Sequence, residues 1–406
     1  MRYLIGFVII FSLFLNQGCK PSDTTENESI EAAETEGLNF RYSIEVLDSV
    51  EVENVLVPAF AFEGKSGDNL VFKDKASSKV FVFDSLGMPL YSWDKSGDVP
   101  GNFSMAADNF VFDKNHNIVL GDNMAGIRVF TIDGQLVLQN RTYQPQTGFH
   151  MFVDLFRKNQ VINKNGKEFL IHHLDLMDDV QQIGEEFYKS RKNLLLTDLT
   201  NGKTKQILPF PEKSKFLAGK AFPFEDFRPV FFFNEKEEVL YLMFQNEAVL
   251  YLFDWKGDEP IYKETILIDL PGFSSHQGWE YKDVEYGLLN AGQLGSPFPS
   301  RIRNLEKIGN DFLISYNPSP ISDSDLEIVR NNEATKELKD RLREETKIKT
   351  VLFDLKTKEV SPIDFPQMRY ESFKLIDEEL WWMKPASKDV EDEDFVVYRG
   401  RIIEKK

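Results

Sequence analysis

The chain contains almost no cysteine: Cys19 is the only one among 406 residues. A chain without a second cysteine forms no internal disulfide, so its fold depends on a large hydrophobic core. Histidine is also scarce, with five residues. The motifs HExxH, CxxC, GxSxG and the Walker phosphate-binding loop do not occur. The sequence therefore predicts no catalytic residues, no metal ion and no cofactor.

The few histidines are poorly placed for a shared site. His172 and His173 are adjacent in an expected strand, so they face opposite sides and cannot bind one metal ion. His116 lies in a short turn, and His150 is interpreted as structural. The acidic run 389–394 offers oxygen ligands for Ca²⁺, but it matches no known calcium loop. A solvated charge run is the interpretation that we prefer.

Basic residues are too few for a polyanionic partner. The chain has 48 Lys and Arg against 66 Asp and Glu, and its net charge is −18. This balance argues against nucleic acid and against docking on an anionic bilayer.

The first residues predict export and a lipid anchor. Arg2 precedes an apolar run over 3–15, and Gly18 stands directly before Cys19. This is typical of a signal peptide over 1–18, with Cys19 as the lipidated first residue of a bacterial lipoprotein. The usual leucine three residues before the cysteine is replaced by Asn16. An ordinary signal peptide with an incidental cysteine is the alternative.

A polar segment follows the lipid anchor. Residues 19–38 contain six acidic residues and one lysine after Cys19, with no aromatic residue. Such a composition predicts a flexible tether. Lys20, in place of aspartate, favours the outer membrane, facing either the periplasm or the cell surface. Residues 39–406 then form the folded domain.

Aromatic residues are abundant and recur in a repeated pattern. The chain has 35 Phe, 13 Tyr and 5 Trp, residues that are favoured in sheets. An apolar run, a polar residue and a short turn with Gly or Lys recur at 80–87, 127–134, 194–202, 250–257, 350–358 and 395–401. Each copy follows another strand-like run, which indicates about four strands per repeat. We predict an all-β fold, a six-bladed β-propeller.

Closure and insertions complete the predicted architecture. The last repeat supplies three strands before the chain ends, and 40–47 is a strand without a neighbour. We expect this N-terminal strand to close the last blade. A helix is expected over 176–192 from its apolar spacing. A second is expected over 322–346, with a capping box at Ser324 and Glu327 and a supporting pair at Glu337 and Arg341.

Two motifs carry a resemblance to a known family. The loop GDVPGNF contains Gly97, Pro100, Gly101 and Phe103, and a DxxxxxRVFxxDG run extends over 122–134. The stretch 80–137 resembles the NHL-like six-bladed β-propeller lipoproteins of unknown function from Gram-negative bacteria. The resemblance covers about two blades and implies fold and export. Characterised relatives include both binders and lyases, so it implies no single activity.

The long connections identify a candidate functional face. In a four-stranded blade, the second-to-third turns and the blade-to-blade links emerge on one face, and every long segment belongs to these classes. The helical insertions therefore lie on one face, where loops can carry function. The candidate ligand-binding residues of 272–303 are His276, Trp279, Tyr281, Tyr286, Gln293, Arg301 and Arg303. Aromatics and amides beside glycines suit a sugar or peptide ligand. The alternative is that Trp279 and the tyrosines only fill a gap between blades.

We interpret the protein as an outer-membrane-anchored binding module for an unknown protein, peptide or glycan. One alternative is an NHL-type lyase or hydrolase that uses His and Arg residues at the channel mouth. Another is a structural subunit of an envelope complex. Convergence of a histidine, an arginine and a carboxylate within hydrogen-bond reach at the channel mouth would favour the enzyme.

The lipid anchor is directly testable. Cys19→Ala removes the only sulfur that can carry the lipid, so the variant should leave the membrane fraction or stay unprocessed. Metabolic labelling with palmitate followed by membrane fractionation measures both. Unchanged labelling of the variant would exclude the lipoprotein assignment.

Overall fold

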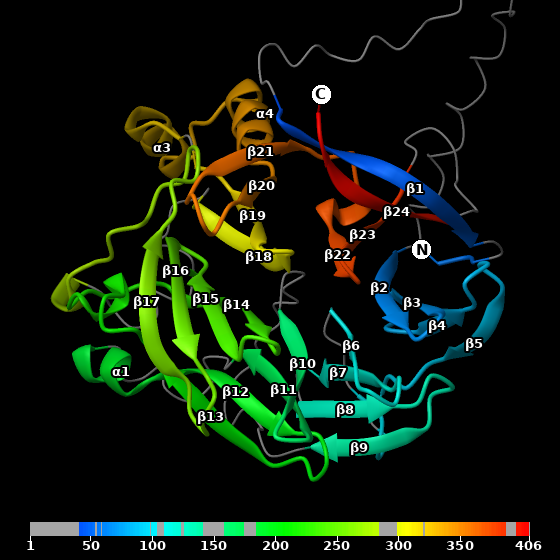
Figure 1. The fold of residues 1–406 in the computed structure, drawn as a ribbon. Helices are drawn as coiled ribbons and strands as arrows, with labels where there is room; N and C mark the ends of the chain where they lie inside the picture. The colour runs from blue at the N-terminus through cyan, green and yellow to red at the C-terminus, as the bar shows by residue number, and fades with distance from the viewer. Residues whose placement is uncertain are drawn as a thin grey trace, which may run out of the picture. The chain divides into compact units, whose positions relative to one another are not determined.

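β-strands make up most of the regular structure in the computed structural model of this chain (Figure 1). The structure describes residues 40–52, 55–57, 59–97, 99–103, 109–122, 126–140, 158–173, 184–283, 299–319, 321–386 and 395–405. The described residues belong to one compact unit, 40–406. Cys19, the predicted signal peptide and the predicted tether up to residue 38 lie outside the described residues. No helix among those described is long and apolar enough to cross a membrane.

Four sheets have four strands each, in chain order. The first sheet is β2 (Phe60–Ser66), β3 (Asn69–Asp74), β4 (Val80–Phe83) and β5 (Pro89–Trp93). The second is β6 (Val111–Phe112), β7 (Ile118–Asp122), β8 (Gly126–Phe130) and β9 (Leu136–Asn140). The third is β10 (Asn159–Lys164), β11 (Lys167–His173), β12 (Lys192–Asp198) and β13 (Thr204–Pro209). The fourth is β14 (Pro229–Asn234), β15 (Val239–Phe244), β16 (Glu247–Asp254) and β17 (Ile261–Leu267).

A fifth sheet has eight strands and contains both ends of the described chain. Its order is β18 (Arg301–Ile308), β19 (Asp311–Asn317), β20 (Lys349–Phe353), β21 (Val360–Asp364), β1 (Tyr42–Val52), β24 (Phe395–Glu404), β23 (Glu379–Met383) and β22 (Phe373–Ile376). β1 pairs antiparallel with β24 through ten residue pairs. The predicted pairing of the N-terminal strand with the last repeat is therefore confirmed, although the strand covers 42–52 rather than 40–47. A two-residue parallel pairing joins β1 to β21.

The first strands of the sheets meet at a common axis. β2 contacts β6 and β22, β10 contacts β6 and β14, and β14 contacts β18. Figure 1 shows these strands toward the centre and β5, β9, β13 and β17 toward the outside. Four-stranded antiparallel sheets set side by side around an axis form a β-propeller-like fold. The all-β prediction is confirmed at this level.

The core lies between neighbouring sheets, where the inward-facing apolar residues of each strand meet. Phe60 stacks on Phe72 within the first sheet, and its ring centroid lies 4.6 Å from that of Phe395 in β24. Phe312 of β19 packs against Tyr241 of β15 at 4.7 Å. Each large side chain buried in this way stabilises the fold by about 1.5–3 kcal/mol.

The motif loop of 97–103 is explained by packing between the first two sheets. Phe103 is fully buried, and the buried Arg128 donates from Nε to the carbonyl of Asn102 at 2.9 Å. Gly134 has a φ of +86°, and a Cβ there would lie 2.7 Å from Cγ of Trp93. The residues that carry the family resemblance therefore fix the contact between adjacent sheets.

The helices differ in detail from the sequence prediction. α1 is Glu185–Ser190, and 174–183 lie outside the described residues, so the first half of the helix predicted at 176–192 is not described. The helix predicted over 322–346 is wrong as a single element, because it divides into α3 (Asp323–Arg330) and α4 (Lys336–Glu345). Short 3₁₀ turns are η2 (Lys215–Leu217), η3 (Phe224–Phe227), η4 (Tyr281–Asp283) and η5 (Arg369–Glu371).

The helix break has a local cause. Thr335 caps α4 by accepting the Leu338 N–H at 3.3 Å, so a new helix begins there. The cap of α3 is Ser322, which accepts the Asp325 N–H at 3.2 Å, rather than the predicted Ser324. Arg341 reaches across to Asp325 at 2.8 Å, whereas the sequence paired it with Glu337.

The insertions fall where the topology predicted. α1 lies between β11 and β12, and α3 and α4 lie between β19 and β20, so both insertions are second-to-third connections of their sheets. The first-to-second turns are short, such as 165–166 and 309–310. Because the two classes of connection leave a sheet at opposite ends of its strands, the helices belong to the same face as the β17–β18 link.

Ring closure by β1 predicts a difference between two truncations. Deleting 20–47 removes the pairs from Tyr42 to Val46 and exposes the edge of β24, so the melting temperature should fall by several degrees. Deleting 20–38 leaves every described pair intact and should leave it unchanged. Thermal denaturation followed by circular dichroism compares the two proteins. Equal melting temperatures would show that this pairing does not stabilise the fold.

Candidate functional site

The predicted ligand-binding residues separate into three groups. His276, Trp279 and Tyr281 lie in the segment that follows β17, and Arg301 and Arg303 lie at the start of β18. Tyr286 and Gln293 lie outside the described residues, as does His150.

Asn246, in the turn between β15 and β16, organises the segment that contains His276. The residue is 1% exposed, and its Oδ1 accepts the His276 N–H at 2.6 Å and Nζ of Lys215 at 2.7 Å. Its Nδ2 donates to the carbonyl of Ser300 at 2.7 Å. Its backbone N–H donates to the carbonyl of Asp226, and its backbone carbonyl accepts from Nζ of Lys215. One buried residue therefore fixes four other segments of the chain.

The loop 271–280 has no regular secondary structure, yet its backbone is held along its length. Gly272 accepts from the Ser319 N–H at 2.9 Å, and Ser274 donates to Oγ of Ser300 at 2.8 Å. Trp279 forms a two-bond antiparallel bridge with Ala221. The loop is therefore ordered before any ligand arrives, which lowers the entropic cost of binding.

Gly278 allows the close approach of this loop to the core. Its φ is +72°, and a Cβ at this position would lie 2.8 Å from the ring of Phe222. A residue with a side chain would be strained here and would collide with Phe222. The glycine therefore allows the backbone next to Trp279 to lie directly against Phe222.

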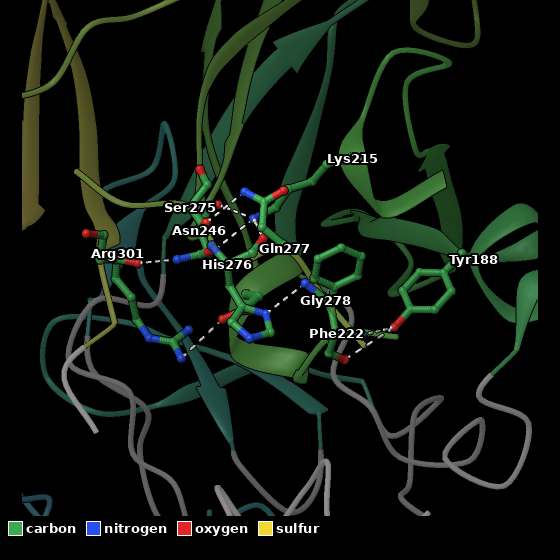
Figure 2. Close-up of polar contacts among 11 residues, drawn as sticks. Tyr188, Lys215, Phe222, Asn246, Ser275, His276, Gln277, Gly278 and Arg301 are labelled. Carbon is green, nitrogen blue, oxygen red and sulfur yellow. Dashed lines mark hydrogen bonds and ion pairs between the residues drawn. The ribbon is translucent and has the colours of Figure 1, made fainter. Parts of the chain in front are cut away.

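A buried carboxylate lies beneath the loop. Asp226 of η3 is 2% exposed; Nη2 of Arg301 lies 3.4 Å from Oδ1, and Nδ1 of His276 lies 3.7 Å from Oδ2 (Figure 2 shows His276 and Arg301). Burial raises the pKa of Asp226 to about 6, and the charges of Arg301 and Lys215 oppose this shift. Burial also lowers the pKa of Lys215 to about 8. A histidine, an arginine and a carboxylate thus lie near one another, but the 3.7 Å between His276 and Asp226 exceeds hydrogen-bond reach, so the condition set for an enzyme is not met by this group.

The hydrogen bonds of His276 determine what its ring can do. Nδ1 accepts the Gly278 N–H at 3.0 Å (Figure 2), so in the neutral ring the proton resides on Nε2. The ring therefore presents Nε2 as a donor, and the Asp–His relay of a hydrolase, which needs a proton on Nδ1, is not formed. The centroid of this ring lies 4.0 Å from that of the half-buried Trp279.

Tyr281 belongs to the protein core more than to an open surface. Its ring stacks on Tyr188 at 6.3 Å, and it packs against the buried cluster around Phe222 and Phe227. Tyr188 is itself held by two hydrogen bonds, in which its hydroxyl accepts the Phe222 N–H at 2.8 Å and donates to the Phe222 carbonyl at 3.2 Å. Burial raises the pKa of both tyrosines. Tyr281 therefore packs against this buried cluster and is only partly open to solvent.

Arg301 and Arg303 have different surroundings. Strand residues two apart share a face, but the pairing of β18 with β19 shifts between Ile302 and Asn304. The extra residue of this β-bulge is Arg303, and bulges redirect side chains. Arg301 turns to Asp226, whereas Arg303 lines the axis of the sheets and donates from Nε to Oδ1 of Asn317.

Two of the remaining histidines, and the aspartate of the turn at 131–135, have local surroundings. Nε2 of His172 lies 3.1 Å from Oγ1 of Thr197, and His116 is exposed in its turn. Asp133 accepts from Thr131 and from Nε2 of Gln135 within one turn. Among the described residues, no group of three or more His, Cys, Asp or Glu side chains is arranged to hold a metal ion.

Sequence reasoning missed Asp226, Lys215 and Asn246. Asp226 and Lys215 lie in the long link between β13 and β14, where charged residues are ordinary. The one available signal for Asn246 was the polar pair Gln245–Asn246 between two apolar runs. That pattern predicts a turn, and nothing in it indicates what the amide contacts.

Comparison with known proteins gives the fold and no activity. No family model and no curated protein matches the chain. The structure is similar to a member of the DUF4221 family from Bacteroides vulgatus, with 12% identity, 90% of this chain and 99% of that chain covered, and a TM-score of 0.61. A Bacteroides fragilis protein described as exported gives 11% identity, coverage of 89% and 96%, and a TM-score of 0.49. A periplasmic gluconolactonase from Pseudomonas aeruginosa gives 9% identity, coverage of 78% of each chain, and a TM-score of 0.38. The first likeness shows a shared fold alone, and the other two are too weak to support an argument.

Removing the Asn246 amide should loosen the loop. Asn246→Ala leaves the His276 N–H and the Ser300 carbonyl without a described partner, at about 1–3 kcal/mol for each buried group that finds no water, while Lys215 keeps the carbonyls of residue 246 and His276. Urea denaturation should show this loss, and proteolysis within 271–280 should accelerate. Asn201→Ala is a matched control, because Asn201 bonds Asp198 in an exposed turn. Equal loss in both variants would exclude the organising role of Asn246.

The pKa of Asp226 predicts a pH-dependent difference. Because the folded-state pKa, about 6, exceeds the value of about 3.9 in an unfolded chain, wild-type protein loses stability as the pH rises through this window. Asp226→Asn abolishes this titration, so the variant should gain stability relative to wild type between about pH 4 and pH 7. The gain is at most about 3 kcal/mol, at roughly 1.4 kcal/mol per pKa unit. Urea denaturation across this range measures it, and a constant difference would contradict the prediction.

Proposed function

We propose that the protein is an outer-membrane lipoprotein whose six-bladed β-propeller binds a partner through the face that carries the loop 271–280. The outer-membrane location is inferred from the sequence, because Cys19 follows the apolar run and Lys20 follows the cysteine. The resemblance to NHL-like lipoproteins over 80–137 supports the same assignment.

The blade count follows from dividing the eight-stranded sheet. Among the described residues, the strand pairing between its halves consists of Tyr42–Ile363 and Ser43–Asp364, which are parallel. Every other described pairing in this sheet is antiparallel. We therefore count β18–β21 as one blade and β22, β23, β24 and β1 as another, beside the four separate sheets.

The binding role rests on one observation. The loop 271–280 has no regular secondary structure, yet its backbone is held by hydrogen bonds while some of its side chains are exposed at the surface. Asn246, Ser300 and Ala221 hold its backbone, while Gln277 is exposed and Trp279 is half-buried. A rigid loop with an aromatic side chain and an amide suits recognition, because large aromatics supply most of the contact energy in many interfaces.

The enzyme hypothesis has weaker support. Its one support is that His276 and Arg301 lie near Asp226, at 3.7 Å and 3.4 Å. However, Nδ1 of His276 is occupied by the Gly278 N–H, so the ring has no lone pair for proton abstraction while it is neutral. Arg301 faces a buried carboxylate and stabilises it. We therefore assign this cluster a role in shaping the loop.

A photo-crosslinking experiment tests the binding face. A benzophenone amino acid at Gln277 should crosslink a partner in native envelopes, whereas the same residue at the exposed Asp258 should not, because Asp258 lies in a turn of the opposite class. Trp279→Ala should lower the Gln277 crosslink by roughly tenfold, the effect of about 1–3 kcal/mol of binding energy. The variant should keep its melting temperature.

Two results would contradict this proposal. One is a crosslink at Asp258 with none at Gln277, which would assign binding to the other face. The second is unfolding of Trp279→Ala, which would show that the tryptophan is a core residue. A partner common to many envelope assemblies would favour the structural-subunit alternative.

A further inference from the structure

The innermost strands of the sheets enclose a cavity that is separate from the loop 271–280. Its volume is about 380 Å³, within the range of about 300–1,000 Å³ typical of ligand pockets. Residues of β2, β6, β10, β14, β18 and β22, or of the segments beside them, form its wall. Of the described residues in 271–283, none lines it.

Two of the innermost strands are distorted where they face this cavity. The pairing of β2 with β3 shifts between Phe62 and Gly64, so Glu63 is the extra residue of a β-bulge, as Arg303 is in β18. The remaining innermost strands, β6, β10, β14 and β22, pair with their neighbours without such a shift. Both extra residues line the cavity. Because bulges redirect side chains and are over-represented next to active sites, this pattern points to a ligand at the axis.

The buried carboxylates of the wall have cationic partners. Glu306 forms an ion pair with Lys158. Glu63 is 3% exposed, and its Oε2 lies 3.8 Å from Nζ of Lys374. The other charged residues of the wall are Arg303, which donates to Asn317, Lys65, whose Nζ lies 5.1 Å from the centre of the Trp381 ring, and the exposed Glu371. A ligand with a net charge would give up its hydration here and disturb pairs that are already formed.

Paired charges still offer hydrogen bonds to a neutral ligand. An ammonium group has three donors and a carboxylate about four acceptor sites. Lys158 donates to Glu306 and to the carbonyl of Leu305, so this pair uses only part of that capacity among the described contacts. Asn304 and Ser315 add an amide and a hydroxyl group to the wall. A sugar hydroxyl both donates and accepts, so it matches such a mixture of groups.

Aromatic rings supply the apolar part of the wall. Phe112 and Phe232 line the cavity, and both are partly exposed. Gly64 allows Phe112 to lie against β2, because a Cβ at this position would lie 2.9 Å from its ring. Ligand pockets of this kind combine aromatic surface, which suits the C–H faces of a sugar ring, with a few placed polar groups.

We propose that the axial cavity binds one neutral sugar ring of hexose size, held by the polar groups of the wall and packed on Phe112 and Phe232. This site is independent of the partner-binding face, because no described residue of the loop 271–280 lines it. The two proposals can therefore fail separately.

Saturation-transfer NMR tests the site on the full chain, in a detergent without a sugar headgroup. The neutral probes are D-glucose, D-galactose and D-mannose. The charged probes are the uronate and the 6-amino-6-deoxy form of whichever neutral sugar binds best. We expect saturable binding of at least one neutral sugar and at least about tenfold weaker binding of both charged forms, because each adds an unbalanced charge to the wall.

Glu306→Gln tests the charge balance of the wall, because it keeps the shape of the side chain but leaves the charge of Lys158 without its partner. The preference for the uronate relative to the neutral sugar should then rise at least about tenfold over wild type. Lys158→Gln changes the same pair from the other side and should shift the preference toward the amino sugar.

Glu259→Gln is the matched control, since it breaks an exposed Lys–Glu pair, with Lys205 at 2.7 Å, outside the cavity. This variant should keep the wild-type preference. Circular dichroism and melting should show that the variants are folded. The proposal is wrong if no neutral sugar binds saturably, if a charged form binds as well as the neutral one, or if both variants of the Lys158–Glu306 pair keep the preference of the control.

Discussion

The antiparallel pairing of β1 with β24 is the constraint on which the rest of the structure depends. Each sheet is flanked by others, and the inward strands contact one another in succession from β22 through β2 to β18. Without β1, the last repeat would lack its outer strand, and the backbone groups of β24 would face solvent. Gly400 shows how close the contact is, because a Cβ there would lie 2.7 Å from the Glu45 carbonyl.

Ion pairs accompany this closure without explaining it. Arg399 lies 2.6 Å from Asp48, and Arg41 lies 2.8 Å from Glu404. Exposed pairs of this kind contribute about 0–1 kcal/mol each. The ten backbone pairs and the burial of Val52 and Val397 against the first sheet supply the stabilisation instead. The stability of the β1–β24 pairing should therefore depend less on salt concentration than that of an interface held by ion pairs.

The sequence predicted the strands well because their signal is local. Apolar and aromatic runs between short turns define β3, β4, β15 and β16 without reference to the rest of the chain. The site was harder to predict, because its determinants are contacts between distant segments. Asn246 looks like any turn residue until His276, Lys215 and Ser300 surround it. Likewise, alternation places Arg301 and Arg303 on one face, and only the register with β19 reveals the bulge that separates them.

That bulge also separates the surroundings of Arg301 from those of Arg303. Ile302, between the two arginines, is fully buried, and its N–H donates to the Gln245 carbonyl at 2.6 Å. β18 is thus anchored to the β15–β16 turn between Arg301, which turns toward the loop, and Arg303, which turns toward the axis. A change at Trp279 alters the surface of the loop without removing this anchor. A change at Arg303 leaves Arg301 paired with Asp226. β18 therefore places Arg301 and Arg303 in separate surroundings, and either side chain can be changed while the contacts of the other are kept.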